Sequence, residues 1–269
     1  MAKHHRSWNA SAYQRYVKEG RGQGVGAEYV PWVCIQDFSS NGMVSRVKGS
    51  KTGRVHHFMS NLEMMFFYLV DWSDEVIDIR EQYPLIDICS AIEIAEKANI
   101  RYPYDTKSGF PYVMTSDFFL DTINGPSVIT IKPSDDLSKQ RVREKLEIER
   151  RYWSSQNIRW RIVTENQINK TKAKNIEWLS QAKDLNQFGL SVKEQEICVA
   201  YFLRQYSDDV NPPNKLIGAI ERELQLTPGM GLNIYKHLAY WKRIPFDVCN
   251  EVDYTNFIEK SRWQNVRGA

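Results

Sequence analysis

The chain has 269 residues, of which 42% are hydrophobic, and a formal net charge of +3. This length supports two modest domains, and no apolar stretch reaches the roughly 18 residues that mark a transmembrane helix, so a membrane protein is excluded. The cysteines are widely separated, which disfavours a zinc site and predicts reduced thiols at Cys34, Cys89, Cys198 and Cys249. The polar N-terminus predicts no signal peptide and a cytoplasmic protein.

Charge is unevenly distributed along the chain. Residues 1–60 hold nine Lys and Arg against three Asp and Glu, a net charge of +6. Residues 61–169 hold thirteen against eighteen, a net of −5, and the remainder fourteen against twelve, a net of +2. The basic segment is therefore the expected contact for DNA phosphates. Its glycines lack the spacing of a phosphate-binding loop, so we expect residues 1–55 to form a flexible basic arm.

Local patterns between residues 56 and 168 predict six elements. Ser60 and Glu63 form a capping-box signature ahead of apolar residues at helical spacing. Alternating patterns and turn signals predict the elements that follow. In chain order they are a helix from Ser60, strands over 75–80, 112–123 and 127–132, a helix over 138–155 and a strand over 158–164, with a loop from the first strand to Pro111. This order is typical of an α/β restriction-endonuclease-like core, a mixed sheet flanked by helices.

The central hairpin carries the most specific signal. Asn124-Gly125 is a strong turn pair between two strand-like runs. If the turn is centred on that pair, Asp117 faces Lys132 directly, and Thr130 lies on the same face of the sheet. An acid and a lysine on adjacent strands are the arrangement of a metal-dependent nuclease of the PD-(D/E)xK kind. The alternative is a surface ion pair, which contributes at most about 1 kcal/mol.

Two further acids are candidates for the same site. Glu63 is a third candidate metal ligand, but it can instead close the capping box by accepting the Ser60 backbone N–H. A helical wheel places Glu149 in the middle of an apolar stripe, where an unpartnered carboxylate would cost several kcal/mol. Either an ion pair with Lys145, one turn away, or a position at the edge of the active site would compensate it.

The region after a polar boundary near residues 166–174 is expected to be helical. Helices are predicted over 174–184, 192–205, 214–225 and 232–242, with a break at Asn211-Pro212-Pro213 and a strand over 243–252. Helix, turn, helix and strand in this order indicate a winged-helix-like domain over residues 169–269. His237, Tyr240 and Trp241 are either nucleic-acid contacts or core residues, and we expect the domain to dock a protein partner or DNA.

Several sequence blocks carry a resemblance to a known family. In chain order they are 18–24, 51–57, 78–82, Pro84-Leu85, the strand of Asp117, Lys132-Pro133, 144–153 and 175–179. Over most of the first 180 residues the chain resembles the TnsA-type endonuclease subunits of Tn-seven-like heteromeric transposases. Several blocks in one order are far more specific than an acid and a lysine alone.

The resemblance implies a Mg²⁺-dependent endonuclease that hydrolyses the non-transferred strand at the 5′ ends of a transposon. Mn²⁺ is expected to substitute, and two ions are expected. Glu63, Asp117 and Lys132 match the family's catalytic positions, and Glu149 matches a further acid. The implied partners are transposon-end DNA, a DDE-type strand-transferase subunit and, through residues 169–269, an AAA+ ATPase regulator.

Thr130 departs from the pattern of such nucleases, many of which have Glu or Gln two residues before the lysine. Because a hydroxyl is a weaker ligand for a hard cation, the expected metal ligands are Glu63, Asp117, Thr130 and the Ile131 carbonyl, with additional water. Lys132 would stabilise charge in the transition state or orient the attacking water. The departure also favours an alternative function, a non-catalytic adaptor that keeps a nuclease fold for DNA or partner binding.

Overall fold

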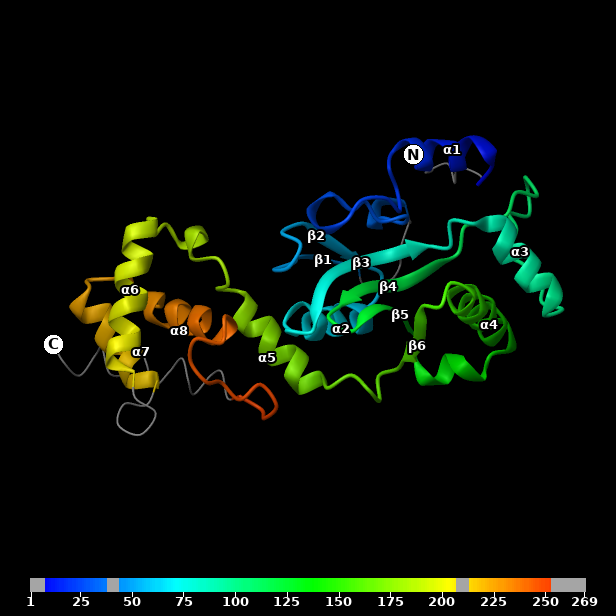
Figure 1. Cartoon of the computed structure of the whole chain (residues 1–269). Coiled ribbons are helices and arrows are strands. Elements are labelled where there is room, and N and C mark those ends of the chain that lie inside the picture. Colours follow the sequence, from blue (N-terminus) through cyan, green and yellow to red (C-terminus); the bar gives the residue numbers. More distant parts are fainter. Residues whose placement is uncertain (1–7, 38–43, 207–212, 253–269) are drawn as a thin grey trace, which may run out of the picture. The chain divides into compact units, whose positions relative to one another are not determined.

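The computed structural model describes residues 8–37, 44–206 and 213–252 (Figure 1). The chain divides into two compact units, residues 1–168 and 169–269, which are considered separately. Within the described residues, no helix is long and apolar enough to cross a membrane.

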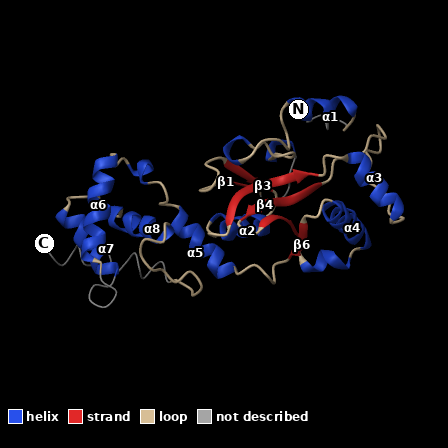
Figure 2. Ribbon diagram, in the orientation of Figure 1, coloured by secondary structure: helices blue, strands red, loops and turns tan. Residues whose placement is uncertain are grey.

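A four-stranded mixed sheet forms the centre of the first unit (Figure 2). Its strands, in spatial order, are β3 (Val76–Pro84), β4 (Thr115–Thr122), β5 (Gly125–Ile131) and β6 (Arg159–Val163). The first three pair antiparallel, and β6 runs parallel to β5 after a helical crossover. Helices flank this sheet, so the predicted α/β restriction-endonuclease-like class is confirmed.

Helices pack on the sheet through two separate hydrophobic clusters. The first joins α2 (Asn61–Asp71) to the sheet, and the second joins α3 (Ile88–Lys97) and α4 (Gln140–Ser155) to it. Neighbouring side chains of β4 divide between the clusters, with Phe118 in the first and Phe119 in the second, because successive strand residues point to opposite faces. Helix α3 lies in the stretch expected to be a loop.

The hairpin between β4 and β5 differs from the expected register by two residues. Phe118 pairs with Ile129, whereas a turn centred on Asn124-Gly125 would have placed Ile131 there. Instead Thr122 pairs with Gly125, and φ is positive at Gly125 (95°) but not at Asn124. A turn centred on the pair would need positive φ at both residues, whereas the observed two-residue turn at Ile123-Asn124, followed by a left-handed glycine, needs it only at Gly125.

The N-terminal segment is folded, so the expected flexible arm is wrong for its described residues. It contains α1 (Ala10–Lys18), two short 3-10 helices, η1 (Gly26–Glu28) and η2 (Ile35–Asp37), and the two-stranded sheet of β1 (Ser45–Lys48) and β2 (Val55–Phe58). The Trp32 amide donates to the Gln82 carbonyl at 3.2 Å, which fastens the segment to β3. Residues 1–7 and 38–43 of the expected arm lie outside the described residues.

A short 3-10 helix, η3 (Ser134–Ser138), follows β5 and leads into α4. The second unit is helical, as expected, with α5 (Lys170–Ser180), η4 (Leu185–Phe188), α6 (Val192–Gln205), α7 (Pro213–Glu223) and α8 (Met230–Tyr240). Pro213 begins α7, and the rest of the predicted proline break lies outside the described residues.

The strand predicted over residues 243–252 is wrong, because this stretch forms turns and irregular backbone. The Asn175 side chain instead donates to the carbonyls of Val248 and Asn250 at 2.9 and 2.8 Å, which fastens the stretch to α5. Of the aromatic residues considered for DNA contact, Tyr240 is buried and Trp241 donates to the Lys183 carbonyl. These two residues contribute to the packing of the unit itself.

Candidate active site

Asp117 and Lys132 lie in contact where β4 and β5 diverge. Backbone pairing of the two strands stops at Phe118 and Ile129, and the Asp117 carboxylate accepts the next hydrogen bond, from the Ile131 amide at 2.6 Å. Lys132 Nζ lies 3.1 Å from Asp117 Oδ2 and donates to the Ile131 carbonyl at 2.8 Å. The observed register differs from the predicted one by two residues, and a shift of two leaves each side chain on the same face of the sheet. Asp117 and Lys132 therefore meet although the predicted register was wrong.

Glu63 caps α2 and also interacts electrostatically with Asp117 and Lys132. Its amide donates to the Ser60 hydroxyl, which donates back to Glu63 Oε1 at 2.9 Å, while the Met59 amide donates to Oε2 at 3.0 Å. The expected bond from the Ser60 backbone is thus replaced by one from Met59. Burial and the charge of Asp117 raise the pKa of Glu63 to about 7. Glu63 therefore keeps its capping contacts while its carboxyl group lies close enough to Asp117 to feel its charge.

Glu149 is buried on α4 and bonded to hydroxyl groups of the sheet. Ser116 and Thr130 both donate to its Oε1. Burial raises the pKa of Glu149 to about 7, although the two hydroxyl donors act in the opposite direction. The alternative pairing with Lys145 is wrong, because that side chain is exposed and forms no ion pair with Glu149.

The four predicted residues therefore meet at one end of the sheet. Burial opposes the charge of Lys132, but Asp117, Glu149 and Glu63 together raise its pKa. Of the three carboxyl groups, Asp117 contacts the Lys132 ammonium group directly, and the other two act on it through charge. Burial is the main cause of the raised pKa values of the two glutamates, and the charge of Asp117 adds to it.

The oxygen atoms at this point fit a hard divalent cation. Asp117, Glu63 and the Ile131 carbonyl are the ligand types that Mg²⁺ accepts, usually together with several waters. Within the described part of the chain, no three His, Cys, Asp or Glu side chains form a metal-binding group by themselves, so the carbonyl and water would complete the shell. The Thr130 hydroxyl is bonded to Glu149 and accepts from Trp160 Nε1 at 3.2 Å. Its role as a metal ligand stays a prediction.

Sequence reasoning missed the residues that support these acids. Ser116, next to Asp117, accepts from Trp153 Nε1 at 2.8 Å while donating to Glu149. Gln82 on β3 approaches Glu63, with 3.5 Å between its Nε2 and Glu63 Oε2. The block containing Gln82 and the tryptophan of α4 were visible in the sequence, but their partners lie on other elements and no local pattern identifies them.

A mixed sheet with an acid on one strand, a lysine at the end of the next and acids on two of the flanking helices is of the restriction-endonuclease-like class. Residues 73–165 match the family described as TnsA-like endonuclease N terminal, and residues 167–248 match TnsA endonuclease C terminal. The chain is 39% identical over 212 residues to the transposon Tn7 transposition protein TnsA of Escherichia coli, covering 78% of this chain and 76% of the relative. The chain belongs to the TnsA family.

Proposed function

We propose that the chain is the Mg²⁺-dependent endonuclease subunit of a transposase and hydrolyses the non-transferred strand at the 5′ ends of a transposon. The observation that carries this proposal is the convergence of Asp117, Lys132, Glu63 and Glu149 at the point where β4 and β5 separate. Membership of the TnsA family supports the class of reaction and a DNA substrate.

In this proposal Glu63, Asp117 and the Ile131 carbonyl hold the cation. When bound, Mg²⁺, or Mn²⁺ in its place, polarises the scissile phosphate and makes a bound water more acidic. Asp117 holds the Lys132 ammonium group at the site. There the ammonium group can stabilise negative charge on the non-bridging oxygens of the phosphate. No covalent enzyme intermediate is needed.

Glu149 has a different part from the two metal-binding acids. Its Oε1 is bonded to Ser116 and Thr130, and its side chain is only 3% exposed. When ionised, Glu149 also acts on Lys132 and Asp117 through its charge. We assign Glu149 the part of holding the ends of β4 and β5 together through Ser116 and Thr130.

Family membership also supports a proposal for the partners of the reaction. The proposed partner for the transferred strand is a second subunit, of the DDE type. The separate helical unit over residues 169–269 is the proposed docking site for an AAA+ ATPase regulator. Transposon-end DNA is the proposed substrate.

Nicking of transposon-end DNA with Mg²⁺ and the partner transposition proteins tests the proposal. Asp117→Asn preserves shape and one acceptor oxygen but removes the charge, so we expect nicking to fall by about a hundredfold or more, near 3 kcal/mol of transition-state stabilisation. Asp121→Asn is the matched control, because Asp121 lies on the same strand but pairs with Arg80. It should leave nicking within about twofold.

The alternative adaptor function predicts a different pattern. A folded wild-type chain that binds transposon ends and its partners but never nicks the non-transferred strand would support an adaptor. Undiminished nicking by Asp117→Asn would remove this residue from the catalytic site.

A further inference from the structure

Gln82 has a backbone conformation that is unusual for its place in the fold. Five non-glycine residues in the described ranges have positive φ, and four of them, Asn99, Asn157, Gln225 and Lys242, follow the end of a helix. A left-handed residue is ordinary at that place. Gln82, with φ of 49°, lies inside β3 and is buried. A strand residue in this conformation costs free energy, so surrounding contacts must hold it there.

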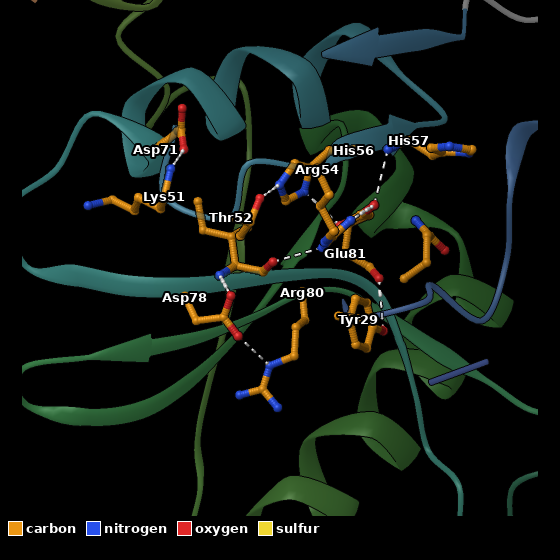
Figure 3. A network of polar contacts seen from close by, with 12 residues as sticks. Tyr29, Lys51, Thr52, Arg54, His56, His57, Asp71, Asp78, Arg80 and Glu81 are labelled. Carbon is orange, nitrogen blue, oxygen red and sulfur yellow. Dashed lines mark hydrogen bonds and ion pairs between the residues drawn. The ribbon is translucent and has the colours of Figure 1, made fainter. Parts of the chain in front are cut away.

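Those contacts are on both sides of Gln82. Glu81 pairs with Phe118, and Tyr83 pairs with Ser116, so the ladder resumes immediately beyond Gln82. The Glu81 carboxylate accepts two bonds from Arg54, at 2.7 and 2.6 Å, and lies 2.7 Å from His56 Nδ1 (Figure 3).

Charge strengthens the contacts that Glu81 makes with Arg54 and His56. Although burial opposes ionisation, His56 and Arg54 lower the pKa of Glu81 to about 2, so its carboxylate is charged at neutral pH. The Tyr29 hydroxyl donates to the Glu81 carbonyl at 3.1 Å. The residue preceding Gln82 is thus fixed through its side chain and its backbone, which prevents relaxation of the left-handed position.

The amide side chain of Gln82 connects the elements that carry the two proposed metal-binding acids. Its Nε2 lies 3.5 Å from Glu63 Oε2, and its Oε1 accepts from the Thr115 hydroxyl at 3.1 Å. Thr115 begins β4 two residues before Asp117. One amide therefore contacts Glu63 on α2 and the start of the strand that carries Asp117.

We propose that Gln82 is a positioning residue of the metal site: its amide sets the orientation of the Glu63 carboxylate relative to Asp117. The left-handed backbone serves this role by directing the side chain toward α2. This inference rests on the proposed function, because it concerns the carboxylates assigned there to the cation. Partners that orient metal-binding side chains commonly contribute tenfold or more to metal affinity.

The test measures the affinity of the full-length chain for Mn²⁺ by isothermal titration without DNA. Gln82→Gly deletes the amide but accepts positive φ freely, so the variant keeps the backbone conformation. We expect its dissociation constant for Mn²⁺ to rise about tenfold. Thr115→Val removes the bond that fixes the amide and should weaken binding in the same direction by a smaller factor.

The matched control is Asn99→Gly, which makes the same change at an exposed left-handed residue that follows α3. It should leave Mn²⁺ affinity within about twofold of wild type. Thermal unfolding of each variant in EDTA separates a structural role from a positioning role, because a purely structural role changes the melting temperature and leaves the affinity unchanged.

The outcomes distinguish this inference from the proposed function. If wild type binds Mn²⁺ and Gln82→Gly binds it equally well, the positioning role is overturned and the metal site stands. If wild type does not bind Mn²⁺, the proposed function fails first and the positioning role falls with it. Weaker binding by Gln82→Gly, with the Asn99→Gly control unchanged, supports the inference.

Discussion

Single carboxyl groups determine how this site responds to pH. Glu149 is buried, and its pKa rises from 4.5 to about 7. Between these values the folded protein retains a proton that the unfolded chain has released. Stability from this group is therefore complete below pH 4.5 and is lost as pH rises through 7. A shift of this size corresponds to about 3 kcal/mol for one group, and Glu63 acts with the same sign.

Glu149→Gln should flatten this dependence, because glutamine imitates the protonated acid. In EDTA, we expect the free energy of unfolding of wild type to fall between about pH 5 and about pH 7.5, and that of the variant to fall less. Urea denaturation at the two pH values measures both slopes. Glu147→Gln is the control, because Glu147 lies on the same helix, where Arg150 holds its pKa near 2 despite some burial. If the free energy of unfolding fell equally with pH in Glu149→Gln and wild type, the raised pKa of Glu149 would be contradicted.

Thr130 joins the buried acid to the sheet. Its hydroxyl donates to Glu149 and accepts from Trp160, so Thr130→Val leaves the buried Glu149 carboxyl and the half-buried Trp160 N–H without this partner. We expect a loss of about 1–3 kcal/mol in the free energy of unfolding. Thr130→Ser keeps the hydroxyl and should lose clearly less. Urea denaturation at one fixed pH compares the variants, and equal losses would show that the methyl group matters more than the hydrogen bonds.

At the scale of elements, the N-terminal segment depends on close backbone packing. A Cβ atom on Gly22 would lie 2.4 Å from the Pro84 ring at the end of β3, and one on Gly24 would lie 2.5 Å from the Glu28 carbonyl. Both glycines have positive φ. The glycines of the expected flexible arm thus belong to a folded segment. Gly22 lets this segment approach the end of β3 at Pro84, two residues after Gln82.

Gly20 and Gly22 provide a matched pair of substitutions for this packing. Their φ values are 74° and 73°, but a Cβ on Gly20 would meet no atom within 4 Å. Both alanine variants should therefore lose about 1 kcal/mol through backbone conformation, and Gly22→Ala should lose a further 1–3 kcal/mol or so through the clash. Chemical denaturation measures the difference. Equal losses in the two variants would mean that the contact with Pro84 adjusts without cost.

At the scale of the whole molecule, chemistry and partner binding are assigned to different units. Every proposed catalytic residue lies in residues 1–168, and the second unit has a hydrophobic core of its own that includes Ile176, Phe202, Ile220 and Leu238. Two cores within one chain are typical of domains that can fold separately.

Removal of residues 169–269 tests this separation. We expect the remaining chain to unfold cooperatively and to bind Mn²⁺, but to lose excision of transposon DNA with its partner proteins. Adding the second unit in trans should not restore excision, because covalent linkage gives an effective concentration of roughly millimolar. Full excision by the truncated chain would show that the second unit contributes stability or DNA contacts that the reaction does not require.

The six elements predicted between residues 56 and 168 follow from local sequence, because helical periodicity, strand alternation and capping each depend on neighbouring residues. Local patterns missed α3 and the elements of the N-terminal segment. The meeting of Asp117 with Lys132 was predictable for a related reason. A register error of two residues preserves which side chains share a face, so the pair survived the wrong turn. The burial of Glu149 followed from its place in an apolar stripe.

Tertiary structure decided the contacts that complete the site. The turn at Gly125 set the register, Ser116 and Thr130 replaced Lys145 as partners of Glu149, and the network of Glu81 fixed Gln82 in its left-handed conformation. Each of these joins residues from different elements, whose separation depends on packing across the sheet. Local sequence therefore predicted the four candidate residues, and packing determined which groups they contact.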